Sequence, residues 1–488
     1  MAERKISRQL GQHLTGVENM FFQVEHVRRL MTICSIWIFS QRLDTTLVLA
    51  SLENLCSHYP RFCLVPKHGS RTETAIWTRP PRTWKPKDQL VFHTLTTPST
   101  LCLQKYIASQ YVQPFDPDKP LWQIHVIAGL KHNQTAILWK AHHSISDGIG
   151  IMKAVFATTT SLDPLAETYR QQKLLEERQA KDTNDRISSQ QQHRPGTFKI
   201  MQWIYWLIWG WYLFISIIQQ LRYELWTLSL LVTPLIRLIQ RRLFWPFTPS
   251  KDTFDYDGDQ TQGKLIAWTD DLARKDIQKV QHQHPGSTLN DVMLLVFERT
   301  VQRYTQDRNM HSHTPLRIVI PLSLRPPSDW SMDNKVTGNI VGLEAGISLQ
   351  QVHRRMMLLK RSLLPAVMYY GPLQHLLRYF PFIMVPRCIQ HWYADLPHAI
   401  FSNIPGPSVP TFFAGQEIID VHALPPQAGK GCISVGLVSY GDSLNLTVLT
   451  DDHPDYPDLA NILCKLFVAE FKTVLQESGQ APSSSCNR

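Results

Sequence analysis

The chain has 488 residues, of which 43% are apolar and 18% are charged, and its net charge is +10. This length accommodates two or three domains, and the low charge with 14 Trp and 20 Phe excludes a disordered chain, a fibrous chain and a disulfide-stapled miniprotein. The Lys and Arg residues form no run typical of nucleic-acid binding. Their densest cluster, Arg237, Arg241 and Arg242, follows an apolar stretch, which favours an anionic membrane surface as the partner.

The first third of the chain alternates strand and helix patterns. MTICSIWIFS predicts a strand, and LDTTLVLASLENLCSHYP predicts an amphipathic helix. LWQIHVIAGL and TAILWKAHH, joined by a polar turn at residues 131–134, predict a β-hairpin. Residues 147–160 have helical spacing, with Ile151, Ala154 and Val155 on one side. The segment from His142 to Gly148 is therefore expected between a strand and a helix.

The middle of the chain changes composition twice. Residues 167–199 are polar and predict a linker, whereas residues 200–218 and 225–236 are almost entirely apolar. The first apolar piece has ~19 residues, just enough to reach across ~30 Å of hydrocarbon, and its Trp and Tyr residues are typical of a membrane interface. A membrane-associated segment is predicted over residues 200–245. The two pieces would form a hairpin or insert from one face, and a buried core helix is the alternative.

The second half returns to a globular pattern. Ser287, Thr288 and Asn290 provide capping chemistry before the predicted helix DVMLLVFERTVQRY. Strands are predicted at LRIVIPLSL, CISVGLVSY and LNLTVLTDD, and a closing helix at LANILCKLFVAEFKTVL. The expected α/β organisation is one domain over residues 1–165, a linker over 166–199, the apolar segment over 200–245, a second domain over 250–477 and a tail over 478–488.

The eight cysteines form no CxxC pair, and several lie within apolar segments. This pattern indicates reduced, mostly buried thiols. The opening MAERKISRQLGQHL lacks the apolar region of a signal peptide, so the folded body is expected to face the cytosol.

The sharpest motif is His142-His143-Ser144-Ile145-Ser146-Asp147-Gly148. A neutral imidazole takes a proton from a hydroxyl near pH 7, a carboxylate four residues later fixes the turn, and glycine allows a tight reversal of the chain. A lone histidine is usually structural, but the complete HHxxxDG pattern at a strand-to-helix junction favours catalysis. Other histidine clusters, at residues 282–284 and 311–313, lack the spacing of a zinc site, and no metal is expected.

Several strings, in order along the chain, resemble the wax ester synthase/diacylglycerol acyltransferase family of HHxxxDG enzymes. They are ENMFFQVEH, HYPRFCLVP and FDPDKPLWQIHVI before the motif, then NDVML, PLSLRP, TGNIVG and FSNIPGP after it. The resemblance implies a two-domain fold similar to chloramphenicol acetyltransferase, with a tunnel between the domains. The membrane-associated segment would be an insertion in the centre of this fold.

The resemblance also implies residue roles. His143 would be the general base that deprotonates an alcohol for attack on the thioester of a fatty acyl-CoA, with no cofactor other than this co-substrate. His142 would pack, and Asp147, followed by Gly148, would anchor the loop. Arg325 in PLSLRP is the expected partner of Asp147, because a guanidinium suits a carboxylate.

Three further residues match motifs of the family. Asn290 and Asp291 form the ND pair, and Asn403 lies in SNIPGP. Each has two interpretations that the sequence leaves open. The ND pair either lines the tunnel or caps a helix, and Asn403 either lines the tunnel or belongs to a Pro-Gly turn.

The expected function is acyl-CoA-dependent O-acyl transfer that forms wax esters from long-chain alcohols, triacylglycerol from diacylglycerol, or both. The alternatives are an acyltransferase for another alcohol or an amine, and an inactive lipid-binding protein. The expected location is the cytosolic face of the endoplasmic reticulum membrane, where acyl-CoA and hydrophobic alcohols meet.

Overall fold

The computed structural model describes most of both halves of the chain. The described residues are 2–25, 29–67, 73–159, 199–244, 263–270, 272–308, 315–326, 328–379, 397–427 and 433–480. The predicted linker at 166–199 lies outside them, apart from residue 199, as does the predicted tail beyond residue 480.

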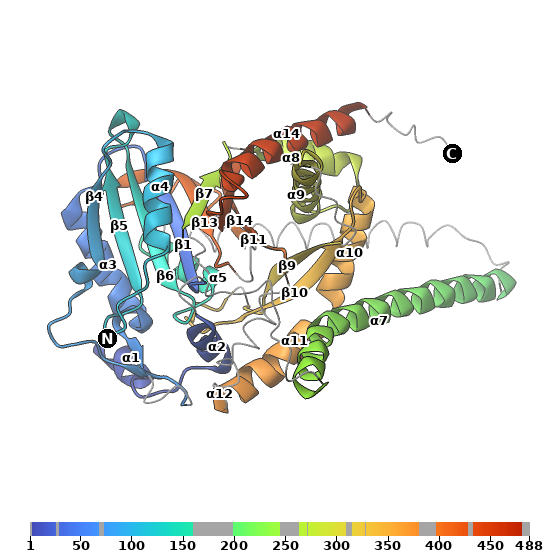
Figure 1. Ribbon diagram of the computed structural model, residues 1–488, viewed down its shortest axis with the longest axis horizontal. Helices are drawn as coiled ribbons and strands as arrows, with labels where there is room; N and C mark the ends of the chain where they lie inside the picture. The colour runs from blue at the N-terminus through green and yellow to red at the C-terminus, as the bar shows by residue number, and fades with distance from the viewer. Residues whose placement is uncertain are drawn as a thin grey trace.

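The first half of the chain builds most of a six-stranded sheet (Figure 1). Its strand order is β12-β13-β1-β6-β5-β4, with β1 (Thr32–Phe39), β4 (Leu90–Thr94), β5 (Trp122–Ala128), β6 (Thr135–His142), β12 (Phe412–Phe413) and β13 (Gln416–Leu424). The predicted hairpin is confirmed, since β5 and β6 are antiparallel and are joined through the short helix η3 (Lys131–Asn133). Strand β6 is buried along its whole length and ends at the HHxxxDG motif.

Helices flank this sheet. They are α1 (Ala2–Gln9), α2 (Gly16–Val24), α3 (Thr45–His58), η1 (Pro60–Cys63), η2 (Pro86–Gln89), α4 (Thr100–Tyr111) and α5 (Gly148–Phe156), with a small ribbon of β2 (Val65–Lys67) and β3 (Ile76–Thr78). The predicted strand and helix between residues 31 and 60 are confirmed as β1 and α3. Helix α3 begins where the Asp44 carboxylate accepts a hydrogen bond from Thr46 N at 2.7 Å, an N-cap that satisfies one orphan amide.

The second half forms a seven-stranded sheet. Its order is β10-β9-β11-β14-β15-β7, with β8 also paired to β15. The strands are β7 (Lys264–Trp268), β8 (Leu272–Ala273), β9 (Leu316–Ser323), β10 (Val336–Leu343), β11 (Ala399–Pro405), β14 (Ile433–Tyr440) and β15 (Ser443–Asp451). The helices packed with these strands are α8 (Arg274–Gln283), α9 (Leu289–Gln306), α10 (Leu349–Arg361) and α14 (Leu459–Gln480). The predicted strands β9, β14 and β15 and the predicted helices α9 and α14 are thereby confirmed.

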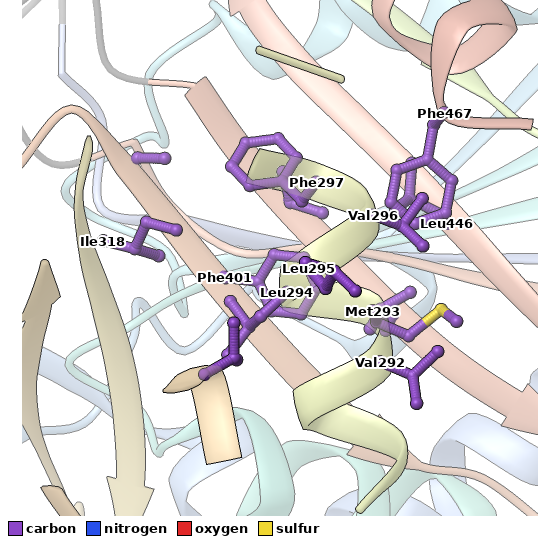
Figure 2. Packing of buried hydrophobic residues seen from close by; sticks show 14 of the residues in the cluster. Val292, Met293, Leu294, Leu295, Val296, Phe297, Ile318, Phe401, Leu446 and Phe467 are labelled. Carbon is purple, nitrogen blue, oxygen red and sulfur yellow. The ribbon is translucent and has the colours of Figure 1, made fainter. Parts of the chain in front are cut away.

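Helix α9 is the centre of the second core. The six apolar residues from Val292 to Phe297 are all buried, so this stretch of the helix is apolar around its whole circumference, as expected of a segment enclosed on every side. Figure 2 shows these side chains pointing toward Phe401 of β11 on one side and toward Leu446 and Phe467 on the other. The capping prediction is correct, because the Thr288 side chain accepts from Asp291 N at the start of this helix.

The two sheets exchange strands. β12 and β13 come from the second half of the sequence, yet β13 pairs with β1 over Cys34 to Phe39 and so extends the first sheet. The predicted domains, residues 1–165 and 250–477, did not include this exchange. It ties the two halves together beside the HHxxxDG loop, because β1 also pairs with β6.

The apolar insertion forms a single helix, α7 (Lys199–Phe244), which extends beyond the body of the molecule (Figure 1). The predicted hairpin is therefore wrong: the helix continues from one apolar piece to the other and through Pro234. Within the described residues, no helix has the combination of length and hydropathy that a bilayer crossing requires. The core-helix alternative is also wrong for residues 206–214, which are exposed, whereas Tyr223 and Thr227 further along the helix are buried.

Five of the eight cysteines fall within the described residues, and none of these five is in a disulfide. Three of them are buried, namely Cys34, Cys56 and Cys464. Cys388, Cys432 and Cys486 lie outside the described part of the chain.

Candidate active site

The HHxxxDG residues form a buried loop between β6 and α5. His142 is the last residue of β6, and Gly148 is the first residue of α5. The backbone N–H of His143 donates to Met31 O at 2.7 Å, which fixes the start of the loop to the segment before β1. Ser144, Ile145 and Ser146 are completely buried, so the loop is part of the core of the first domain.

Asn334, a residue of the second half, orients the imidazole of His143. The Asn334 side-chain N–H donates to His143 O at 2.8 Å, which places its amide oxygen 3.1 Å from His143 Nδ1. An amide oxygen only accepts hydrogen bonds, so Nδ1 carries the proton. Nε2 is then the basic nitrogen, which is the arrangement that general-base catalysis requires.

The surroundings of His143 keep its imidazole neutral. The residue is 7% exposed, and Phe21 of α2 stacks on its ring with centroids 3.8 Å apart. Burial lowers the pKa of His143 from 6.5 to about 4, because removal from water disfavours the charged form. At neutral pH, nearly every molecule therefore holds a free base at this position.

Asp147 anchors the loop to a helix and to the second domain. Its Oδ1 accepts from Gly150 N at 2.7 Å and caps α5, and its Oδ2 accepts from Lys335 N at 2.8 Å. The predicted pairing of Asp147 with Arg325 is confirmed, since Arg325 Nη2 lies 2.8 Å from Asp147 Oδ2 and both side chains are buried. Arg325 also donates to Ser331 O at 2.6 Å. These bonds explain how the carboxylate holds the loop in place, in agreement with its expected anchoring role.

His142 has different partners from His143. Its Nδ1 accepts from Ser144 N at 3.0 Å, so Nε2 carries the proton and lies 2.9 Å from Glu25 Oε2. The Glu25 carboxylate also accepts from Met31 N at 3.0 Å. His142 thus connects the loop to the segment after α2, and a packing role fits this position.

The glycine of the motif has a different role from the expected one. Gly148 is the first residue of α5 and is not among the residues with positive φ, so the expected tight reversal at this position is wrong. A Cβ on Gly148 would lie an ordinary 3.4 Å from the Ile404 side chain. Gly150 is the constrained glycine, because a Cβ there would lie 2.1 Å from Ser146 Oγ and 2.9 Å from Arg325 Nη2.

His143 lines a cavity of about 490 Å³ between the two halves of the molecule. This volume falls in the range of ~300–1,000 Å³ that is typical of small-molecule sites. The walls are mostly apolar, and no Lys or Arg is among the lining residues that the structure describes. The apolar lining residues include Met20, Phe21, Met31, Ile33, Val319, Val336, Ile340, Met368, Leu373, Ile400 and Ile404. The cavity suits a hydrocarbon chain and places a base at its wall.

The remaining predicted residues separate into two groups. Asn403 lines the cavity and donates to Asn290 Oδ1 at 2.7 Å, so these two residues meet. Asp291 is fully buried, and its Oδ2 accepts from Thr288 N at 2.7 Å and lies 2.8 Å from His353 Nδ1. The capping interpretation therefore holds for Asp291, whereas Asn403 belongs to the wall.

Two interactions that support the base were not predicted. Asn334 lies 191 positions after His143, outside the HHxxxDG motif and outside the strings that resemble the family. The second is Arg61, which is buried and donates to Glu18 of α2, to Ile145 O at 3.0 Å and to Met332 O at 2.7 Å. Arg61 lies within HYPRFCLVP and Glu18 within ENMFFQVEH, two of the strings that resemble the family. The resemblance was therefore the sequence signal that pointed to these two residues.

The chain matches two family models. Residues 14–243 match the wax ester synthase/diacylglycerol acyltransferase catalytic domain, and residues 344–474 match the WS/DGAT C-terminal domain. The O-acyltransferase WSD of Acinetobacter baylyi is 21% identical over 386 residues, which are 74% of this chain and 75% of that protein.

Solved structures share the fold. The wax ester synthase/diacylglycerol acyltransferase from Marinobacter aquaeolei VT8 aligns with a TM-score of 0.59 at 16% identity, over 96% of this chain and 100% of that one. The starter condensation domain of rhizomide synthetase, in a complex with C8-CoA and Leu-SNAC, aligns with a TM-score of 0.52 at 13% identity, over 99% and 97% of the two chains. By its matches to both domain models, the chain belongs to the wax ester synthase/diacylglycerol acyltransferase family and is an O-acyltransferase.

Proposed function

We propose that the enzyme transfers a fatty acyl group from acyl-CoA to a hydrophobic alcohol and releases a neutral lipid ester. The acceptor is a long-chain alcohol, diacylglycerol or both. The observation that carries this proposal is the neutral imidazole of His143 at the wall of a cavity of about 490 Å³ with mostly apolar walls.

In the proposed reaction, His143 Nε2 removes the proton of the acceptor hydroxyl as its oxygen attacks the thioester carbonyl. The C–O bond forms, and the tetrahedral intermediate collapses with cleavage of the C–S bond. The thiolate of CoA then receives the proton from the imidazolium. Asn334 accepts a hydrogen bond from Nδ1–H throughout, so it stabilises the imidazolium that forms during the reaction. This route uses acyl-CoA as a co-substrate and needs neither a metal nor a covalent acyl-enzyme.

The test replaces the base. Loss of a general base typically reduces turnover ~100- to 10,000-fold, so His143→Ala is expected to lose activity by this factor while remaining folded. The control is His125→Ala, because His125 is also buried, on β5, but is not among the residues that line the cavity. Near-normal turnover of His143→Ala would contradict the mechanism.

The acceptor class is tested by comparing hexadecanol, dioleoylglycerol and short polar alcohols with one acyl-CoA. The apolar walls favour the first two acceptors. Faster transfer to a short polar alcohol or to an amine would instead assign the enzyme to another branch of acyltransferases.

We also propose that the enzyme works at the cytosolic face of the endoplasmic reticulum membrane, attached through α7 lying in the interface. The support is the exposed surface of this helix, which has Trp206 64%, Trp209 52% and Leu213 47% exposed. An exposed apolar surface of this kind is typical of membrane or partner contact. Replacing these three residues by Ser is expected to release the protein from membranes washed with carbonate, and continued pelleting of the variant would contradict the attachment.

A further inference from the structure

One wall of the cavity is formed by a thin segment that is apolar on both sides. It consists of α11 (Leu364–Met368), the π-helix η4 (Tyr369–Leu376) and α12 (Leu377–Tyr379). Toward the inside, Leu364, Pro365, Met368 and Leu373 line the cavity. Toward the outside, the same segment exposes large apolar side chains, namely Leu363 73%, Val367 61%, Tyr370 62% and Tyr379 67%.

This pattern differs from that of an ordinary surface helix. A surface helix has one apolar face toward the core and a polar face toward water. Here cavity-lining and exposed apolar side chains belong to the same short segment. Leu376 belongs to both sides, since it lines the cavity and is 43% exposed. Residues 363–379 therefore contribute both to the cavity wall and to the surface.

The backbone of the segment is irregular. Pro372 lies inside the π-helix, where it has no N–H to donate, and Gly371 precedes it. π-Helical turns are wider than α-helical ones and are frequent at functional sites. Such a wall has fewer backbone hydrogen bonds to hold it closed than a regular helix of the same length.

Helix α7 is joined directly to this segment. Glu224 of α7 accepts from Ser362 Oγ at 2.8 Å and from Leu363 N at 3.1 Å, immediately before α11. Thr227, one turn further along α7, lines the same cavity. Figure 1 shows the end of α7 beside α11, so the helix with the exposed aromatic residues and the wall of the cavity are neighbours in the fold.

The charge of both elements suits an anionic lipid surface. Over residues 199–244, the sequence has five Lys and Arg residues and a single acidic residue, Glu224, whose carboxylate already accepts two hydrogen bonds from residues 362 and 363. Over residues 363–379, the sequence contains Arg378 and neither Asp nor Glu. Exposed apolar side chains with basic residues near them are typical of segments that lie in the interface of anionic membranes.

We propose that the outer face of residues 363–379 rests on the lipid bilayer and that the acceptor alcohol passes from the bilayer into the cavity through this wall, without crossing water. This proposal rests on the proposed function, because it assigns the route by which a hydrophobic acceptor reaches His143. Acyl-CoA, which is water-soluble, does not need this route.

The experiment separates delivery from chemistry by using two acceptors. One is dioleoylglycerol in vesicles of phosphatidylcholine and phosphatidylserine, and the other is hexanol supplied in water. The variant is Val367→Glu with Tyr370→Glu, which places two carboxylates on the outer face without changing a residue that lines the cavity. The control is Phe92→Glu on β4, because Phe92 is 56% exposed and lies in the outermost strand of the first sheet, far from α11 in Figure 1.

With the vesicle acceptor, the variant is expected to lose at least ~10-fold in rate, because its two carboxylates replace apolar side chains in the contact and are repelled by the anionic phosphatidylserine; this factor corresponds to about 1.4 kcal/mol. Its rate with hexanol should stay within ~2-fold of the unchanged enzyme, and the control should keep both rates. Equal losses with both acceptors, or no loss with vesicles, would overturn the route. A change of oligomeric state in light scattering would also overturn it, because the face would then be an interface between proteins. If the unchanged enzyme acylates neither acceptor, the proposed function itself fails.

Discussion

Asn334→Asp is expected to move the pH dependence of the enzyme, because it replaces the neutral acceptor of His143 by an anion of the same shape. In the structure, the amide oxygen of Asn334 lies 3.1 Å from His143 Nδ1, and both side chains are buried. A carboxylate in this place would stabilise the imidazolium. The replacement also removes the side-chain N–H of Asn334, which donates to His143 O at 2.8 Å.

The size of the effect follows from the geometry. The pKa of His143 is about 4 because burial disfavours its charged form. An opposite charge within hydrogen-bond distance raises such a pKa by ~1–3 units, so the aspartate variant should titrate between ~5 and ~7. The acidic limb of kcat/KM should move upward by the same amount, since this limb reports the base in the free enzyme.

The assay measures kcat/KM between pH 4 and pH 8 for the unchanged enzyme, Asn334→Asp and Asn334→Ala, with circular dichroism at each pH to verify folding. The alanine variant removes the acceptor that stabilises the imidazolium in the transition state, and a hydrogen bond to a charged group contributes ~1.5–3 kcal/mol, so its kcat should fall ~10- to 150-fold. The reasoning is refuted if the acidic limb of Asn334→Asp stays where it is, or if Asn334→Ala keeps its full turnover.

Two further predictions concern stability. Gly150→Ala should lower the free energy of unfolding by ~1–3 kcal/mol, because its Cβ would overlap with Ser146 Oγ. Gly148→Ala should change the free energy of unfolding by less than ~1 kcal/mol. Urea titration measures both values, and a larger loss of stability in Gly148→Ala would contradict the prediction. Acidification should also destabilise the fold, because His143 has a folded-state pKa of about 4 and an ordinary value of 6.5. Its contribution is complete above pH 6.5 and decreases as the pH falls toward 4, by about 2 kcal/mol at pH 5. His143→Gln should remove this part of the pH dependence, and an unchanged slope in that variant would argue against it.

The local elements and the base could be predicted from the sequence because their signals are local. The apolar runs of β5 and β6, and the capping residue Thr288, depend on neighbours in the chain. The pair of Asp147 and Arg325 was predicted across 178 positions, because a buried carboxylate needs a cation and the resemblance supplied the position.

Other features depend on contacts that no local pattern encodes. The sequence has two apolar pieces and does not show that they form one helix, α7. Between the two pieces, the Tyr223 O–H donates to Ile340 O in β10, and this contact attaches the helix to the second domain. The need for glycine at position 150, rather than at 148, arises because Ser146 Oγ and Arg325 Nη2 occupy the space beside it.

By itself, the sequence determined the α/β character of the chain, the family to which it belongs and the identity of His143 as the candidate base, because these follow from periodicity and from a motif of adjacent residues. Only the tertiary structure decided which nitrogen of His143 is basic, since Asn334 reaches it from 191 positions away. It also decided the shape of the cavity, because the strand exchange through β13 and the wall at residues 363–379 bring together side chains from both halves of the chain. Such packing contacts are specific to pairs of residues that are distant in sequence, and for this reason the order of the amino acids does not show them directly.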